Sequence, residues 1–312
     1  MKIASTSPAP RRLSRSLITT LTLSVMGACC LSQATFCKPK VLDLISTAEL
    51  FMPGVVSTEA SEVRLAKSPD GKTLLWGSTN RPGGIGGWDI WLSRRSQAGW
   101  SVPQPAPFDS TANEFDPTFS PDGRYVYFFS NRPGGLGGDD IYRAPVASDG
   151  FAAAERLGPE VNSAGDEWAP SLSPDGKTLL FATNGRGGAG KHDLFTARID
   201  GTGFATARGL PGAINTPGDE FDATFVADGN AVVFARSRDA ENDPIALYFS
   251  SLDAGRYGEG TVLPQTVNVD AGYTLGPTID WTDRSILYFS GHRAEVSAGK
   301  MDIYRVHFRV KP

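Results

Sequence analysis

Short apolar runs recur at even spacing along the chain, and polar turns and glycine-rich loops separate them. The runs cover residues 73–76, 125–129, 178–181, 231–234 and 285–289. The run at 125–129 reads Tyr-Val-Tyr-Phe-Phe with no polar interruption, which is typical of a strand that is buried on both faces. The pattern therefore predicts short strands in stacked sheets, with no helical periodicity.

Each run follows a ten-residue segment that recurs through the chain. The copies read EVRLAKSPDG at 62–71, EFDPTFSPDG at 114–123, EWAPSLSPDG at 167–176, EFDATFVADG at 220–229 and TLGPTIDWTD at 274–283. Equivalent positions from Asp70 to Thr282 lie 52, 53, 53 and 54 residues apart. A fixed period of this length indicates a repeat architecture.

Each repeat holds the elements of four short strands. The Pro-Asp-Gly turn suits a tight antiparallel connection, because proline presets φ and glycine accepts a positive φ. A glycine-rich loop leads to a third strand, which begins with Asp-Ile-Tyr at 140–142, and a weak fourth strand follows. Since one four-stranded sheet cannot cover its own faces, the repeats are predicted to pack as an all-β, five-bladed β-propeller over residues 48–312.

The two ends of the repeat region complement one another. The chain ends with a third strand near 303–310 that has no fourth strand after it, whereas residues 48–56 resemble a fourth strand without the first three. We expect residues 48–56 to complete the last blade, because this closes the ring and leaves no open edge. Residues 35–47 are expected to be a linker.

The N-terminal 34 residues have the pattern of a secretory signal. Four basic residues and no acidic one precede or flank an apolar stretch from Leu17 to about Leu31 that is too short to span a membrane. Ser32-Gln33-Ala34 offers a signal-peptidase site, while Met26-Gly27-Ala28-Cys29 resembles a lipobox that would end the signal before a lipidated Cys29. Both possible cleavage sites predict a periplasmic or cell-surface protein.

Charge and cysteine content narrow the function classes. Without the signal, 26 basic residues face 34 acidic ones, a net charge of about −8. So acidic a domain is a poor ligand for nucleic acids or anionic membranes, and neither is expected as a partner. The three cysteines, Cys29, Cys30 and Cys37, all precede the repeats, so no disulfide or thiolate metal site is expected in the propeller.

The repeat resembles the TolB-type, WD-like β-propeller repeat of bacterial envelope proteins. Residues 120–142 carry the resemblance most fully, with Ser-Pro-Asp-Gly, an aromatic-rich strand, and then Ser-Asn-Arg-Pro-Gly-Gly before Asp-Ile-Tyr. The resemblance covers about residues 48–312. It implies an exported scaffold that binds a protein or glycan of the cell envelope.

Charged residues recur at three positions of the repeat, at the start of the first strand, in the second loop and at the start of the third strand. They are Glu62, Glu114, Glu167 and Glu220; Arg81, Arg132, Arg186, Arg238 and Arg293; and Asp89, Asp140, Asp193 and Asp302. We expect them to form a charge-paired staple in each blade, with the arginine fork holding the carboxylates. The alternative is an acidic, cation-binding ring.

Departures from the repeat mark the candidate binding face, since a fivefold repeat does not arrange groups asymmetrically around one ligand. The fourth repeat replaces the glycine loop with a charged segment, and the fifth introduces new polar residues. The candidates are Trp88, His192, Arg236, Asp239, Glu241, Asp243, His292 and Glu295. The alternative interpretation is ordinary drift in solvated loops.

Enzyme signals are sparse. The three histidines, His192, His292 and His307, lack metal-ligand spacing, and no Gly-x-Ser-x-Gly elbow occurs. We therefore predict no catalytic residues, metal or cofactor, and a monomeric, non-enzymatic scaffold for an envelope protein or glycan. The alternative is a five-bladed, glycan-active hydrolase with two carboxylates among Asp239, Glu241, Asp243 and Glu295, for which a deep pocket is needed.

Overall fold

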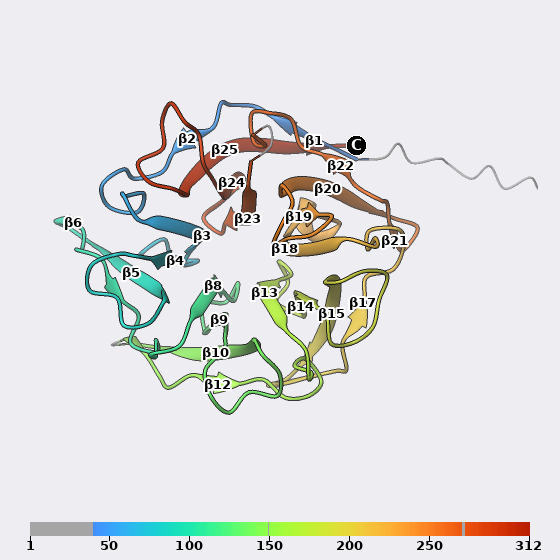
Figure 1. Ribbon diagram of the computed structural model, residues 1–312, viewed down its shortest axis with the longest axis horizontal. Helices are drawn as coiled ribbons and strands as arrows, with labels where there is room; N and C mark the ends of the chain where they lie inside the picture. Colours follow the sequence, from blue (N-terminus) through green and yellow to red (C-terminus); the bar gives the residue numbers. More distant parts are fainter. Residues whose placement is uncertain (1–39, 149, 270–271) are drawn as a thin grey trace, which may run out of the picture. The chain divides into compact units, whose positions relative to one another are not determined.

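Five antiparallel sheets are arranged in a ring around a central axis in the computed structural model, which describes residues 40–148, 150–269 and 272–312 (Figure 1). Apart from one 3-10 turn at Ala227–Gly229, the regular elements of these residues are strands. The predicted all-β, five-bladed β-propeller is confirmed. No helix in the described part of the chain is long and apolar enough to cross a membrane.

The first three blades run consecutively along the chain, each with a short fifth strand beside its third. Blade one contains β3 (Ser61–Lys67), β4 (Thr73–Thr79), β5 (Trp88–Ser96), β6 (Gly99–Trp100) and β7 (Gln104–Pro105). Blade two contains β8 (Glu114–Phe119), β9 (Tyr125–Ser130), β10 (Asp140–Ala147), β11 (Gly150–Phe151) and β12 (Glu155–Arg156). Blade three contains β13 (Glu167–Leu172), β14 (Thr178–Thr183), β15 (Asp193–Asp200), β16 (Gly203–Phe204) and β17 (Arg208–Gly209).

Blade four is also consecutive along the chain, whereas blade five combines the C-terminal strands with two strands from the N-terminal part. Blade four contains β18 (Asp219–Val226), β19 (Ala231–Ser237), β20 (Ala246–Asp253), β21 (Arg256–Tyr257) and β22 (Thr261–Val262). Blade five contains β23 (Thr274–Asp280), β24 (Asp283–Gly291), β25 (Asp302–Lys311), β1 (Val41–Leu44) and β2 (Glu49–Leu50).

N-terminal strands close the ring, as predicted, but they begin earlier than expected. β2 pairs with β25 through Leu50 and Tyr304, and β1 pairs with the end of the same strand through Val41 and Lys311. β1 thus lies inside the segment expected to be a linker. Its Leu42 is buried against the core, and this burial together with the ladder to β25 explains why the segment is a strand.

The apolar runs form the blades' second strands and pack between neighbouring blades. Phe128 of β9 is fully buried and packs against Leu75 and Ile90 of blade one in a single apolar cluster. The preceding turn is built as its sequence predicts, since Gly123 has φ 71° and its N–H donates to the Ser120 carbonyl. Packing on both faces accounts for the uninterrupted apolar pattern of these strands.

The innermost strand of every blade carries a bulge at the same repeat position. The ladder between the first and second strands shifts register there in all five blades. The residues at the shift have left-handed backbones, with φ between 48° and 62°: Arg64, Asp116, Ala169, Asp222 and Gly276. Four of the five are not glycine, although this conformation costs an L-residue about 1–2 kcal/mol. We call these five positions the bulge ring.

Candidate functional site

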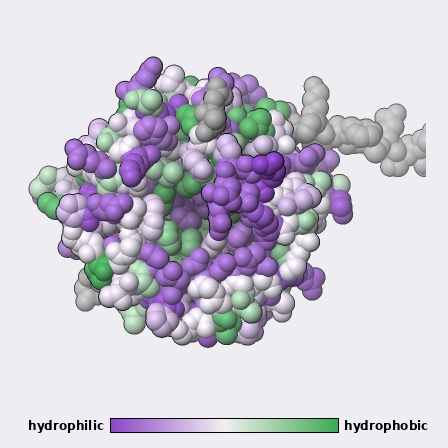
Figure 2. All heavy atoms as spheres, viewed as in Figure 1, coloured by the Kyte–Doolittle hydropathy of each residue, from purple (hydrophilic) through white to green (hydrophobic). Residues whose placement is uncertain are grey.

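A cavity of about 420 Å³ opens on the ring axis, and we call it the axial pocket. Each innermost strand contributes the apolar side chain that precedes its bulge residue: Val63, Phe115, Trp168, Phe221 and Leu275. In the view down the axis, a hollow with apolar residues lies at the centre of the ring (Figure 2). The pocket is therefore formed jointly by all five blades, on the face where the third strands begin.

Five aromatic rings contribute to the pocket wall: Trp88, Phe115, Phe129, Trp168 and Phe221. Trp88 lies 5.3 Å from Phe115 between ring centroids, and Phe115 stacks on Phe129 at 4.9 Å. Trp168 continues the wall, 6.4 Å from Phe129 and edge-on to Phe221 at 6.2 Å. Such a wall offers broad, polarisable surface to an apolar or flat ligand group.

Charged residues of the bulge ring lie at the floor. Arg64 is fully buried and extends across the axis, donating from Nη2 to the Pro170 carbonyl at 3.0 Å, with Nη1 3.7 Å from Asp222 Oδ1. Asp222 in turn accepts the Gly276 N–H at 2.8 Å. Within the described structure, Arg64 Nε and Nη1 are buried and have no hydrogen-bond partner, and Arg64 itself does not line the cavity but lies beneath Asp116 and Asp222, which do.

The carboxyls of the pocket resist ionisation. Burial raises the pKa of Asp116 well above its usual value, and the neighbouring Asp222 charge adds to this, while Arg64 acts in the opposite direction. Burial likewise raises the pKa of Asp222, which Arg64 partly offsets. Burial also raises the pKa of Asp139, although the Trp168 Nε1 hydrogen bond at 2.7 Å favours its charged form. Burial therefore favours the protonated form of these three carboxyls over the ionised form, relative to exposed carboxyls.

Two of the predicted site residues belong to this pocket or support it. Trp88 lines the cavity directly. His192 is buried behind it, stacked on Trp168 at 3.7 Å between centroids, with Nδ1 2.8 Å from Asp219 Oδ1. Its Nε2 is buried and unpartnered among the described residues. His192 thus positions the Trp168 ring.

The charged loop of the fourth repeat lies outside the axial pocket. Asp239 pairs with Lys191 at 2.7 Å and Asp243 pairs with Arg238 at 2.8 Å, so these two acids already have cationic partners. Glu241 is exposed in the same loop. These acids do not line the cavity in which a two-carboxylate mechanism would operate.

Arg236 has a different role from the one expected. Because it lies on β19, its side chain turns inward and its Nε donates to Glu220 Oε1 at 2.7 Å. It therefore takes the staple position that the sequence assigned to Arg238. The remaining two candidates, His292 and Glu295, are exposed in the loop between β24 and β25 and do not line the axial pocket.

The recurring charges act within the blades. Three glutamates pair with arginines: Glu62 with Arg81 at 3.7 Å, Glu114 with Arg132 at 2.8 Å and Glu220 with Arg236. Arg186 and Arg293 donate to backbone carbonyls instead, and Glu167 accepts from Ser163 and Thr183. The aspartates Asp89, Asp140, Asp193 and Asp302 accept N–H groups of their own glycine loops. The recurring glutamates, arginines and aspartates therefore do not converge on one ring.

Among the described residues, no group of three or more His, Cys, Asp or Glu side chains is placed to hold a metal ion.

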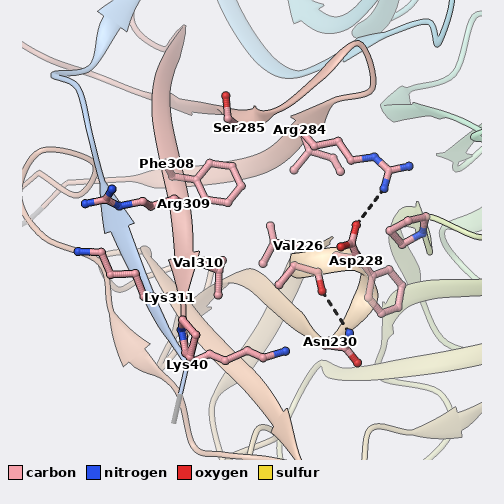
Figure 3. Close-up of a pocket in the computed structure, with 15 residues that line it drawn as sticks. Lys40, Val226, Asp228, Asn230, Arg284, Ser285, Phe308, Arg309, Val310 and Lys311 are labelled. Carbon is pink, nitrogen blue, oxygen red and sulfur yellow. Dashed lines mark hydrogen bonds and ion pairs between the residues drawn. The ribbon is translucent and has the colours of Figure 1, made fainter. Parts of the chain in front are cut away.

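A second cavity of about 500 Å³ lies between blades four and five, beside the C-terminal strand. Figure 3 shows Lys40, Arg309 and Lys311 around it, with Arg284 joined to Asp228 at 3.2 Å. It is formed mainly by blades four and five, with Pro174 from the turn between β13 and β14 of blade three, on the face opposite the axial pocket. We therefore place the candidate site at the axial pocket.

Sequence reasoning missed Arg64, Asp116 and Asp222, which lie three positions into each repeat segment. A signal was present, because one strand position holds arginine, aspartate, alanine, aspartate and glycine in successive copies. Asp and Gly within an apolar strand indicate a left-handed or bulged backbone. Cys29 and the proposed signal lie outside the described residues.

Comparison with known proteins supports the fold. No family model matches the chain, and no curated protein matches it. TolB from Acinetobacter baumannii is 17% identical with a TM-score of 0.50, and the match covers 82% of this chain and 57% of that one. A putative TolB from Agrobacterium tumefaciens is 18% identical with a TM-score of 0.50, covering 88% and 99%. A periplasmic gluconolactonase from Pseudomonas aeruginosa is 17% identical with a TM-score of 0.44, covering 79% and 71%. At these identities the likeness establishes the propeller fold alone.

Proposed function

We propose that this chain is an exported, non-enzymatic scaffold that binds a protein or glycan of the cell envelope through its axial pocket. The observation that carries the proposal is the pocket itself, whose aromatic wall and buried charges occupy positions where the five repeats differ. A pocket of this size, mostly apolar with a few convergent polar groups, is typical of ligand sites.

The location in the envelope rests on the N-terminal pattern and on the likeness to TolB-type propellers. Cleavage of the signal at either site would leave the propeller beyond the cytoplasmic membrane, and a lipidated Cys29 would also tether it to a membrane there. A Cys29→Ser variant tests the tether. Transfer of the protein from the membrane fraction to the soluble periplasmic fraction supports lipidation, and an unchanged membrane association contradicts it.

The binding role is tested with glycan and peptide arrays on the purified protein. Trp168 forms the middle of the aromatic wall, so Trp168→Ala should weaken capture of any pocket ligand at least tenfold. Trp281 is the matched control, because it packs against Arg284 beside the second cavity. Equal capture by both variants and the natural protein would contradict a role for the axial pocket.

A second candidate function, a glycan-active hydrolase, is favoured by the neighbouring buried carboxyls of Asp116 and Asp222. An acid whose pKa is raised by burial keeps the proton that a leaving group needs, while a nearby carboxylate can serve as base or nucleophile. Every captured glycan is therefore also assayed for hydrolysis. Turnover that Asp116→Asn abolishes would establish the hydrolase and displace the scaffold.

A further inference from the structure

We infer that the axial pocket selects a ligand that carries an organic ammonium group, seated against the aromatic wall and above the carboxyl of Asp116. The inference rests on the proposed function, because it specifies the chemistry of that same pocket. It is carried by three observations within the described structure: aromatic rings of the wall that no arginine or lysine covers, a buried carboxyl that forms no ion pair, and the excess of acids over cations around the cavity.

The aromatic rings of the pocket wall differ from most other aromatic clusters of the ring, because among the described residues the His192 imidazole is the basic group that stacks on one of them, and no arginine or lysine does. Arginines lie over the outer aromatics of every blade that bears the staple, as Arg132 does over Tyr142 at 4.8 Å and Arg236 over Tyr248 at 4.8 Å. In the described structure no arginine or lysine lies over a ring of the pocket wall: Trp88, Phe115, Phe129, Trp168 or Phe221. An aromatic enclosure of this kind attracts ammonium groups by cation–π interaction.

The carboxyl of Asp116 lines the cavity and lacks a strong partner. The residue is only 7% exposed, and its hydrogen-bonding neighbour is another carboxyl, that of Asp222. Asp222 differs, since it accepts the Gly276 N–H and lies 3.7 Å from Arg64. A buried carboxylate without a donor is costly, and a ligand ammonium would supply the missing donor.

The charges that face the floor come from every neighbouring element. Asp222 and Arg64 face Asp116 from the innermost strands of blades four and one, and Asp139 faces it from the loop residue just before β10. His192, Asp140 and Asp166 lie around Asp139, and the exposed Lys300 lines the rim. Three acids that line the cavity, Asp116, Asp139 and Asp222, thus face only two cations, the buried Arg64 and Lys300 at the rim. A bound ammonium restores the balance and favours the ionised carboxyls, so binding should release protons and weaken as the pH falls.

The experiment compares two probes of the same shape, choline and its neutral isostere 3,3-dimethylbutan-1-ol, titrated against the full chain by tryptophan fluorescence and calorimetry. We expect choline to bind at least tenfold more tightly, to release protons, and to lose affinity at low pH. Glucosamine against glucose repeats the comparison on a sugar and shows whether the ammonium can be part of a glycan unit.

Matched variants locate the effect. Asp116→Asn should weaken ammonium binding at least tenfold, whereas Asp228→Asn, in the turn beside the second cavity, should leave it unchanged. Both aspartates have left-handed backbones, with φ 51° and 55°, which asparagine adopts readily, so both variants should fold. Lys300→Met should strengthen binding severalfold, because it removes the competing rim cation.

Three outcomes overturn the inference: equal binding of choline and the isostere, no effect of Asp116→Asn, or no ammonium binding in either probe pair. Capture of a neutral glycan or a peptide that Trp168→Ala removes would overturn the ammonium inference while upholding the proposed function. If no array ligand or ammonium probe depends on Trp168, both the inference and the proposed function are wrong.

Discussion

Replacing Asp109 with asparagine should stabilise this protein, because the other blades show what the position requires. In blade two, Asn162 accepts the Ile141 N–H at 2.8 Å and donates to the Ile141 and Leu157 carbonyls at 3.0 and 2.9 Å. Asn268 makes the same three bonds in blade four. Asp109 occupies this anchor position beside Ile90, where a carboxylate cannot donate to a carbonyl.

The contacts of Asp109 show why a carboxyl at this position destabilises the folded state. Asp109 accepts the Ala106 N–H at 3.1 Å, but its Oδ1 is buried without a partner among the described residues. Burial, with the charges of Glu114 and Asp89, raises its pKa to about 9. At pH 7 the folded state therefore binds a proton that the unfolded state has released, so stability falls as the pH rises from about 4 to about 9.

At about 1.4 kcal/mol for each pH unit, this uptake costs at most about 4 kcal/mol at pH 7. Asparagine supplies the donor without a proton, so we expect Asp109→Asn to add about 1–3 kcal/mol to the free energy of unfolding at pH 7. Urea unfolding at pH 5 and pH 7.5 measures it, and the gain should be larger at pH 7.5.

The reverse substitution, at the equivalent position of blade two, is the control. Asn162→Asp should introduce the same defect into blade two, with a loss of stability that is greater at pH 7.5 than at pH 5. The reasoning is refuted if Asp109→Asn is no more stable than the natural protein at pH 7.5, or if its gain is the same at both pH values.

Three further substitutions test the ring, the staple and the bulge by urea unfolding. Phe51→Ala removes an edge-on contact with Tyr288, 5.0 Å between centroids, that ties the N-terminal segment to blade five, and should cost about 3–5 kcal/mol. Val102→Ala, at an 87% exposed site, should cost almost nothing, and equal losses would contradict the closure. Glu114→Ala leaves the largely buried Arg132 without its carboxylate and should cost about 3–5 kcal/mol; a loss below 1 kcal/mol would show that the staple is dispensable. Ala169→Gly relieves a left-handed alanine with φ 53° and should add about 0.5–1 kcal/mol, whereas a loss would contradict the strain.

The architecture was predictable because its determinants are local and repeated. A turn, which reads Ser-Pro-Asp-Gly in three of the five repeats, and the apolar strand after it specify one hairpin, and five evenly spaced repeats specify five blades. The boundary of the closing segment was less predictable. β1 is a short, isolated Val-Leu-Asp-Leu segment whose strand character comes from pairing with β25, some 270 residues away in sequence.

The candidate site was predictable only in part. Trp88 and His192 stand out because they precede a conspicuous third-strand aspartate. Arg64 and Asp222 meet at 3.7 Å only because the ring brings the first and fourth blades together across its axis, and a sequence pattern does not show which side chains face an axis. The charged loop of the fourth repeat departs from the other repeats in composition, yet two of its three acids, Asp239 and Asp243, form ion pairs with Lys191 and Arg238.

At the five positions of the bulge ring, the side chain can differ from blade to blade while the backbone shape stays the same. That backbone shape is kept by ladders on either side, while the five copies already carry side chains as different as arginine, aspartate, alanine and glycine. A substitution at Asp116 or Asp222, which line the cavity, would alter its lining while the ladders on either side keep the bulge. The shape of the innermost strand and the chemistry of the cavity can therefore change independently, because hydrogen bonds of the backbone hold the first and side chains set the second.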